Sequence, residues 1–123
     1  MLALNTQRRD RILQATGWKE LSPGTLNLEV PEDCVHRLLL CTAKIREGAE
    51  DVRYPEQYAH IPRLRVGYLY YNGRIRKGNK VALVLIRRAC NPLKTRLEAL
   101  SEGKLRESLE LSDGDSIVCE VDE

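Results

Sequence analysis

Apolar and polar residues alternate along much of this chain, which is the pattern of half-buried β-strands. Aliphatic, β-branched and aromatic residues are concentrated in its second half, where Asn72-Gly73 and Gly78-Asn79 have the composition of hairpin turns. The expected strands, in chain order, are residues 25–30, 64–71, 74–75, 81–86, 97–100 and 116–121. The pattern therefore predicts a mainly β fold.

Helical signals are few and short. Residues 6–15 predict a helix that is capped by Asn5 or Thr6 and ends at Gly17, and residues 104–109 predict a second one. The apolar segment 35–45 fits a buried strand and a short helix equally well. Residues 48–62 show little periodicity and predict a long irregular loop, which contains the tyrosines best suited to stack on a flat ligand, Tyr54 and Tyr58.

The composition is that of a soluble globular protein. With 123 residues, 42% of them hydrophobic and 31% charged, the chain is expected to form one domain over residues 1–123. No apolar run is long enough for a membrane helix, and nothing near Met1 resembles an export signal, so we expect a cytoplasmic protein. The four cysteines lack the spacing of zinc or redox motifs and are expected to be reduced. They are Cys34, Cys41, Cys90 and Cys119.

The net charge of +2 conceals two blocks of opposite sign. Between Glu56 and Glu98 there are many lysines and arginines and no acidic residue, whereas acidic residues predominate after Glu98. The basic block could be a solvated face of strands, or it could attract a nucleotide triphosphate or a nucleic-acid backbone. Charge alone leaves these alternatives open.

The first candidate site residues follow the turn Pro23-Gly24. In a strand, residues two apart project from the same face, so the Thr25 hydroxyl and the Asn27 amide oxygen are expected to point to one spot. Neutral oxygens suit Mg²⁺ that keeps most of its ligands as water and phosphate. This pair therefore predicts a magnesium site for a bound nucleotide.

The second candidate segment is residues 96–109. It starts as an extended stretch that presents Glu98, then passes through a small-residue turn at Ser101 and Gly103 into the short helix. Backbone N–H groups at such a turn can bind phosphate or the edge of a base.

In order and spacing, these segments resemble the archaeal-type riboflavin kinases, which use CTP to make FMN. The resemblance covers residues 7–121 and is carried by Pro23-Gly24-Thr25-Leu26-Asn27, Glu98, Lys104-Leu105-Arg106 and Leu111-Ser112-Asp113-Gly114-Asp115. It implies a small closed six-stranded cradle-loop β-barrel with one or two short helices. Barrel closure also agrees with the shortness of the predicted strands, because closing a sheet hides its edges.

The resemblance further implies transfer of the γ-phosphoryl group from CTP to riboflavin in a magnesium-dependent reaction by a monomer. By position, Thr25 and Asn27 would bind magnesium, and Glu98 would hydrogen-bond the flavin. Cys90 stands where the family usually has a threonine that contacts the flavin. The implied nucleotide-binding residues are Gly103, Lys104, Leu105 and Arg106. We add the hypothesis that Glu98 orients or deprotonates the accepting hydroxyl.

One difference from the family opens two alternatives. Family members begin with a glycine-rich strand that holds the nucleotide phosphates, whereas this chain begins Met1-Leu2-Ala3-Leu4-Asn5, as expected of a divergent or N-terminally shortened member. A flavin or nucleotide binder without catalysis is the first alternative. The second is a DNA-binding regulator of the swapped-hairpin type, which the basic block favours and the acidic ending opposes, so nucleic acid is not the expected partner.

Overall fold

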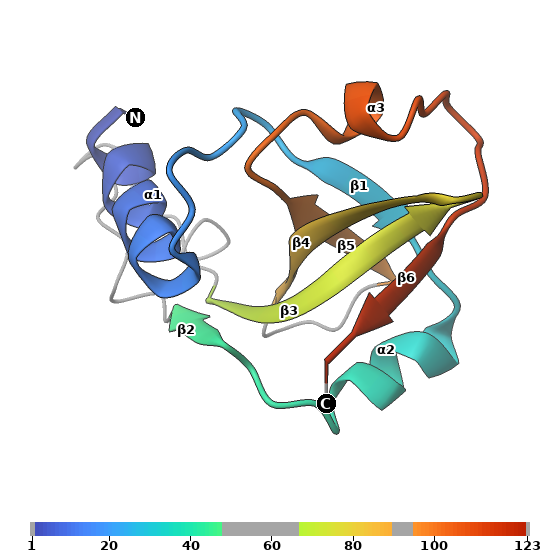
Figure 1. The fold of residues 1–123 in the computed structure, drawn as a ribbon. Coiled ribbons are helices and arrows are strands. Elements are labelled where there is room, and N and C mark those ends of the chain that lie inside the picture. The colour runs from blue at the N-terminus through green and yellow to red at the C-terminus, as the bar shows by residue number, and fades with distance from the viewer. Residues whose placement is uncertain (1, 48–66, 90–94, 123) are drawn as a thin grey trace.

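The computed structural model describes residues 2–47, 67–89 and 95–122, with side chains from Arg8 onward. Its elements, in chain order, are α1 (Leu2–Thr16), β1 (Leu26–Glu29), α2 (Glu32–Leu38), β2 (Ile45–Glu47), β3 (Tyr68–Lys77), β4 (Lys80–Ala89), β5 (Arg96–Leu100), α3 (Leu105–Ser108) and β6 (Val118–Val121). The strands form the centre of the fold and the three described helices lie around them (Figure 1). None of the described helices has the length and apolarity that crossing a membrane requires.

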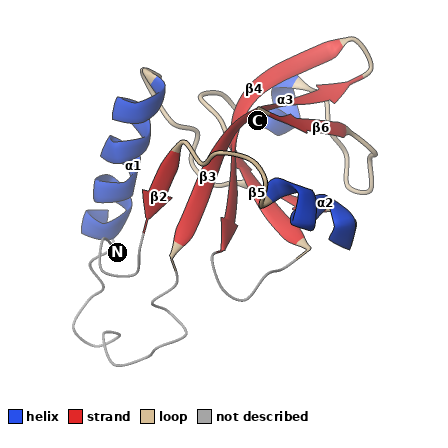
Figure 2. Ribbon diagram, turned by 90° about the horizontal axis from the view of Figure 1, so that it is seen from below, coloured by secondary structure: helices blue, strands red, loops and turns tan. Residues whose placement is uncertain are grey.

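All six strands belong to one curled antiparallel sheet. Its order is β1-β5-β4-β3-β2, and β6 pairs with the second half of β3 on the edge whose first half pairs with β2. Figure 2 shows the long β3–β4 hairpin at the centre of this sheet. The predicted mainly β class is confirmed. Among the described strands β1 pairs with β5 alone, so closure into a barrel stays a prediction.

The β3–β4 hairpin confirms one predicted turn and corrects another. Gly78 and Asn79 form its two-residue loop, and Gly78 has the positive φ of +60° that glycine accepts most readily. The turn predicted at Asn72-Gly73 is wrong, because β3 runs through both residues. A Cβ atom on Gly73 would collide with the backbone carbonyl oxygen of Glu120. This glycine therefore allows the close approach of β6.

The helices agree largely with the sequence pattern. α1 extends over the predicted segment and is followed by Gly17, whose φ of +77° suits a helix end. α3 lies within the predicted 104–109 segment. The ambiguous segment 35–45 divides between the end of α2 and the start of β2. The long loop predicted over 48–62, with Tyr54 and Tyr58, lies outside the described residues.

Two apolar clusters occupy opposite faces of the central strands. Consecutive residues Tyr70 and Tyr71 of β3 belong to different clusters, as the alternation of a strand requires. The larger cluster includes Tyr71, Ile86 and Leu97. The smaller one joins Ile12 of α1 to Tyr70, Leu85 and Leu100, so α1 packs on the face of the sheet that Tyr70 shares.

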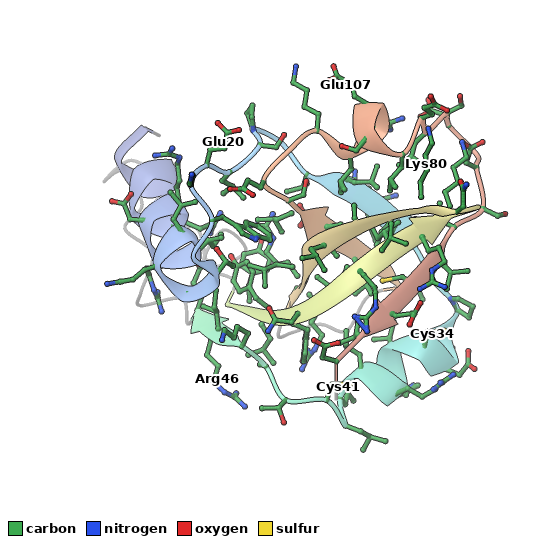
Figure 3. The ribbon with its side chains drawn as sticks, viewed as in Figure 1. Glu20, Cys34, Cys41, Arg46, Lys80 and Glu107 are labelled. Atoms are coloured by element: carbon green, nitrogen blue, oxygen red, sulfur yellow. The ribbon has the colours of Figure 1, made fainter. Side chains whose placement is uncertain are left out.

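Acidic residues from the end of the chain neutralise part of the basic block. On β3 and at the β3–β4 turn, four cations contact carboxylates of the last third of the chain: Arg74 with Glu120 and Asp122, Arg76 with Glu120, Lys77 with Asp115, and Lys80 with Glu110. Lys80 stands at the turn end of the hairpin (Figure 3). For these four residues the arrangement supports the interpretation of a solvated, charge-compensated face.

Candidate functional site

The two candidate segments meet because β1 and β5 are neighbours in the sheet. Asn27 lies directly opposite Glu98 in the antiparallel register. Thr25, just before β1, donates a hydrogen bond from its Oγ1 to Oε2 of Glu98 at 2.8 Å. The structure thus brings Thr25 into contact with Glu98, 73 residues further along the chain, and places Asn27 opposite Glu98 on the neighbouring strand.

A residue that the sequence did not single out, Arg87 of β4, lies on the other side of Glu98. Its Nη2 donates to the same carboxylate oxygen, Oε2, at 2.6 Å. The register places Tyr70, Arg87, Glu98 and Asn27 opposite one another on β3, β4, β5 and β1. We call these four residues the cross-strand row. Residues opposite one another in a sheet share a face, so the row is continuous across four strands.

Opposing effects act on the ionisation of Glu98. Burial raises the pKa of its carboxyl. The hydrogen bond and charge of Arg87 and the hydrogen bond from Thr25 lower this pKa, and together they outweigh burial, so the pKa is lowered overall. Burial also acts to lower the pKa of Arg87, and its contacts with Glu98 and Tyr70 reverse this, so that pKa is raised. At neutral pH the site therefore contains an ionised glutamate held by a charged arginine.

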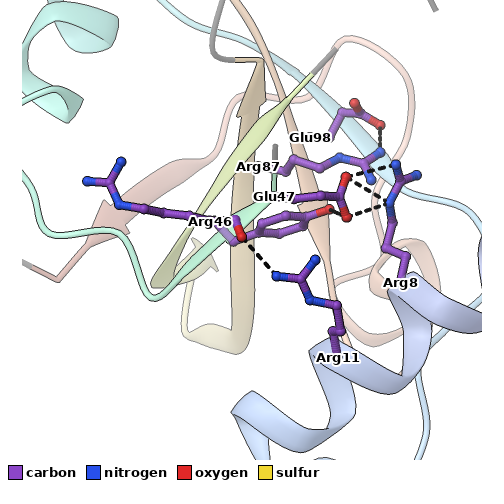
Figure 4. A network of polar contacts seen from close by, with 7 residues as sticks. Arg8, Arg11, Arg46, Glu47, Arg87 and Glu98 are labelled. Atoms are coloured by element: carbon purple, nitrogen blue, oxygen red, sulfur yellow. Dashed lines mark hydrogen bonds and ion pairs between the residues drawn. The ribbon is translucent and has the colours of Figure 1, made fainter. Parts of the chain in front are cut away.

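A second arginine–glutamate pair connects the row to α1 (Figure 4). Arg8 of α1 binds Glu47 of β2 through two nitrogens, with Nε to Oε2 at 3.0 Å and Nη2 to Oε1 at 2.9 Å. The Glu47 side chain is only 3% exposed, and the Tyr70 hydroxyl also donates to it, at 3.4 Å. The Tyr68 ring contacts both guanidinium groups, at 5.4 Å from Arg8 and 4.7 Å from Arg87.

A cleft of about 350 Å³ lies between the two candidate segments. Its lining residues are Ser22, Pro23, Gly24, Thr25, Leu26, Ala99, Ser101, Lys104, Leu105, Arg106 and Glu107. Thr25 lines this cleft. Glu98 is not among the lining residues, but it accepts the hydrogen bond from Thr25. A neighbouring cleft of about 480 Å³ shares Leu26 and Arg106 with the first, and Asn27 and Asp113 also line it.

The four residues expected at the nucleotide have different surroundings. Lys104 and Arg106 are exposed at the cleft, where Arg106 pairs with Asp113 at 2.9 Å. Leu105 is buried in the larger apolar cluster and also lines the cleft. Gly103 accepts a hydrogen bond from Ser101 and lines a separate cleft beside Trp18. Cys90, expected at the flavin, lies outside the described residues.

The hydroxyl of Thr25 and the amide oxygen of Asn27 are donors of the kind that suits a magnesium ion bound together with phosphate, and they line neighbouring clefts. Thr25 uses its hydroxyl proton in the bond to Glu98, so the lone pairs of Oγ1 are available to a cation. The described residues contain no cluster of three or more histidine, cysteine, aspartate or glutamate side chains that could hold a metal by themselves. An ion at this site would therefore need further ligands from water or a nucleotide.

Comparison with known families matches nearly the same residues as the resemblance described in the sequence analysis, which covers residues 7–121. A family model described as "Domain of unknown function DUF120" matches residues 10–121, which is nearly the whole chain. Neither the curated proteins nor the solved structures include a significant match. The matched range contains both candidate segments and the complete cross-strand row.

Proposed function

The family model that matches residues 10–121 is that of the CTP-dependent riboflavin kinases, so the chain belongs to this family, and we propose that it transfers a phosphoryl group from CTP to riboflavin. In this reaction the terminal ribityl oxygen forms a bond to the γ-phosphorus and the bond from that phosphorus to the β,γ-bridging oxygen breaks. The products are FMN, CDP and the proton of the hydroxyl. Catalysis of this kind depends mainly on positioning and charge neutralisation.

The position of Thr25 is the observation that carries this proposal. Thr25 lines the cleft between the two candidate segments and also hydrogen-bonds Glu98 at 2.8 Å. A nucleotide in the cleft and a hydroxyl at Glu98 would thus approach each other beside Thr25. Thr25 and Asn27 would hold Mg²⁺, which when bound neutralises phosphate charge.

Glu98 is proposed to bind the accepting hydroxyl of riboflavin. Its pKa is lowered despite burial, so it is ionised at neutral pH and can accept a hydrogen bond. A carboxylate with a lowered pKa is a weak base, and orientation of the hydroxyl is therefore its main role. Cys90 is proposed to contact the flavin as well.

The triphosphate is proposed to lie against Gly103, Lys104, Leu105 and Arg106. Lys104 and Arg106 supply positive charge at the cleft, and both side chains are more than half exposed (66% and 59%). Their present partners, Glu107 and Asp113, form surface ion pairs of the kind that contributes little to stability. Phosphate can therefore replace these partners at small cost.

We further propose that the protein acts in the cytoplasm as a monomer.

The test is to incubate the protein with riboflavin, Mg²⁺ and either CTP or ATP, and to separate the flavins by chromatography. We expect FMN with CTP, loss of the product when EDTA removes the metal, and recovery when Mg²⁺ is restored. The Arg96→Gln variant is a suitable control, since Arg96 forms an exposed pair with Glu29 next to the site. Flavin or nucleotide binding with no FMN from either donor would instead identify a non-catalytic binder.

A further inference from the structure

Arg87 is a buried cation that the reaction described above does not use. Its side chain is 10% exposed, and among the described residues its Nε has no hydrogen-bond partner. Burying a guanidinium group is costly unless its charge is paired. Its partner is the carboxylate that the proposed reaction needs, because Nη2 lies 2.6 Å from Oε2 of Glu98.

Both hydrogen bonds to Glu98 from described residues end on the same oxygen. Arg87 and Thr25 donate to Oε2, at 2.6 and 2.8 Å, and no described residue donates to Oε1. The side chain of Glu98 is 28% exposed, so a ligand can reach it. As far as the described residues go, one oxygen is thus held by two hydrogen bonds and the other is left as an acceptor.

The position of Arg87 is itself fixed by packing. Its guanidinium carbon lies 4.7 Å from the centre of the Tyr68 ring and 5.9 Å from that of Tyr70. Arg8 contacts the Tyr68 ring as well, at 5.4 Å, and is held by Glu47. A planar cation between aromatic rings loses little further conformational freedom when it binds a carboxylate.

We propose that Arg87 is a positioning residue, which together with Thr25 fixes Oε2 of Glu98 and so presents Oε1 to the accepting hydroxyl of the substrate. The identity of that substrate rests on the proposed function, whereas the effect of Arg87 on Glu98 does not. Arg87 acts through Glu98 and has no contact with the reacting atoms in this proposal.

The experiment compares wild type with Arg87→Gln, Arg87→Lys and the control Arg96→Gln, which makes the same change in the exposed pair with Glu29. For Arg87→Gln we expect kcat to fall by about 10- to 100-fold at neutral pH, the loss of one charge-assisted hydrogen bond, with a smaller change in KM for riboflavin. Arg87→Lys should recover part of the loss in kcat, and the control should match wild type.

A second measurement does not depend on activity. Crystal structures of wild type, the two Arg87 variants and the control show where the Glu98 carboxylate lies. It should keep its position in the control, shift in Arg87→Gln and shift less in Arg87→Lys. If Arg87→Gln does not fold, Arg87→Lys against wild type decides the question.

Two results would overturn the proposal. One is an unchanged position of the Glu98 carboxylate in the Arg87 variants. The other is a loss of kcat that is matched by an equal rise in KM and is not recovered in Arg87→Lys, which is what a purely structural role predicts. A wild-type protein that forms no FMN would instead refute the proposed function, and the crystal structures would still decide whether Arg87 positions Glu98.

Discussion

Replacing Glu98 by glutamine tests the centre of the proposed site with little change in shape. The amide oxygen can take the place of Oε2 and accept the bonds from Arg87 and Thr25, which now measure 2.6 and 2.8 Å. The NH2 group then takes the place of Oε1, and a donor replaces the acceptor that faces the substrate. The negative charge is lost as well.

The expected size of the effect follows from this exchange. A hydrogen bond to a charged acceptor contributes about 1.5–3 kcal/mol, which corresponds to a fall in kcat of about 10- to 150-fold. Larger losses, up to about 10⁴-fold, accompany the removal of an effective general base. Because the pKa of Glu98 is lowered, we expect the smaller range. Riboflavin binding should weaken less than turnover, since in the proposed role Oε1 contacts the accepting hydroxyl and not the flavin ring.

The assay measures kcat and the KM for riboflavin at saturating CTP, with a thermal melt of each protein to exclude unfolding. Glu29→Gln is the matched control, because Glu29 makes an exposed pair with Arg96 in the same two strands. Equal losses in flavin binding and turnover would refute the orienting role, and a loss near 10⁴-fold would show that Glu98 is the base.

Three further predictions concern stability and reactivity. Glu47→Gln should lower the free energy of unfolding by about 3 kcal/mol in urea titrations, because it leaves the cation of Arg8 without its buried partner; an unchanged midpoint would contradict this. Gly73→Ala should cost about 1–3 kcal/mol, since its methyl group collides with the carbonyl of Glu120, and a neutral effect would mean that β6 can move away. Burial raises the pKa of Cys119 to about 11, so at pH 8 only about one in a thousand Cys119 thiols is ionised, and iodoacetamide should modify this residue in urea but not in the native protein, as mass spectrometry would report.

The sequence was enough to select Thr25, Asn27 and Glu98 as candidates, through alternation for the first two and the motif resemblance for the third. That β1 pairs with β5, so that Asn27 lies opposite Glu98, comes from the structure. The turn at Gly78-Asn79 was also predictable, because a glycine at the first loop position suits a tight hairpin with positive φ. Local signals of this kind depend on neighbouring residues alone.

Arg87 could not be found in this way, because its role depends on which strands pair and in which register. Within the basic block it looks like the other arginines, yet it lies opposite Glu98, whereas Arg88 points to the other face and hydrogen-bonds Tyr71. The error at Asn72-Gly73 has a similar cause. A glycine that forms a turn and one that admits a neighbouring strand have the same local sequence, and only the position of β6 distinguishes them.

Arg87 and Arg106 differ in exposure, and this difference suits them to different roles in the proposed site. Arg106 is 59% exposed and pairs with Asp113, which is 92% exposed, so this pair can separate at small cost, as the proposed binding of phosphate requires. Arg87 is enclosed by Tyr68, Tyr70 and Glu98, and releasing it would leave a buried charge unpaired. A cation that can exchange partners suits the capture of a nucleotide. A cation that cannot do so suits the fixing of an acceptor, and its strand neighbours determine where that acceptor stands.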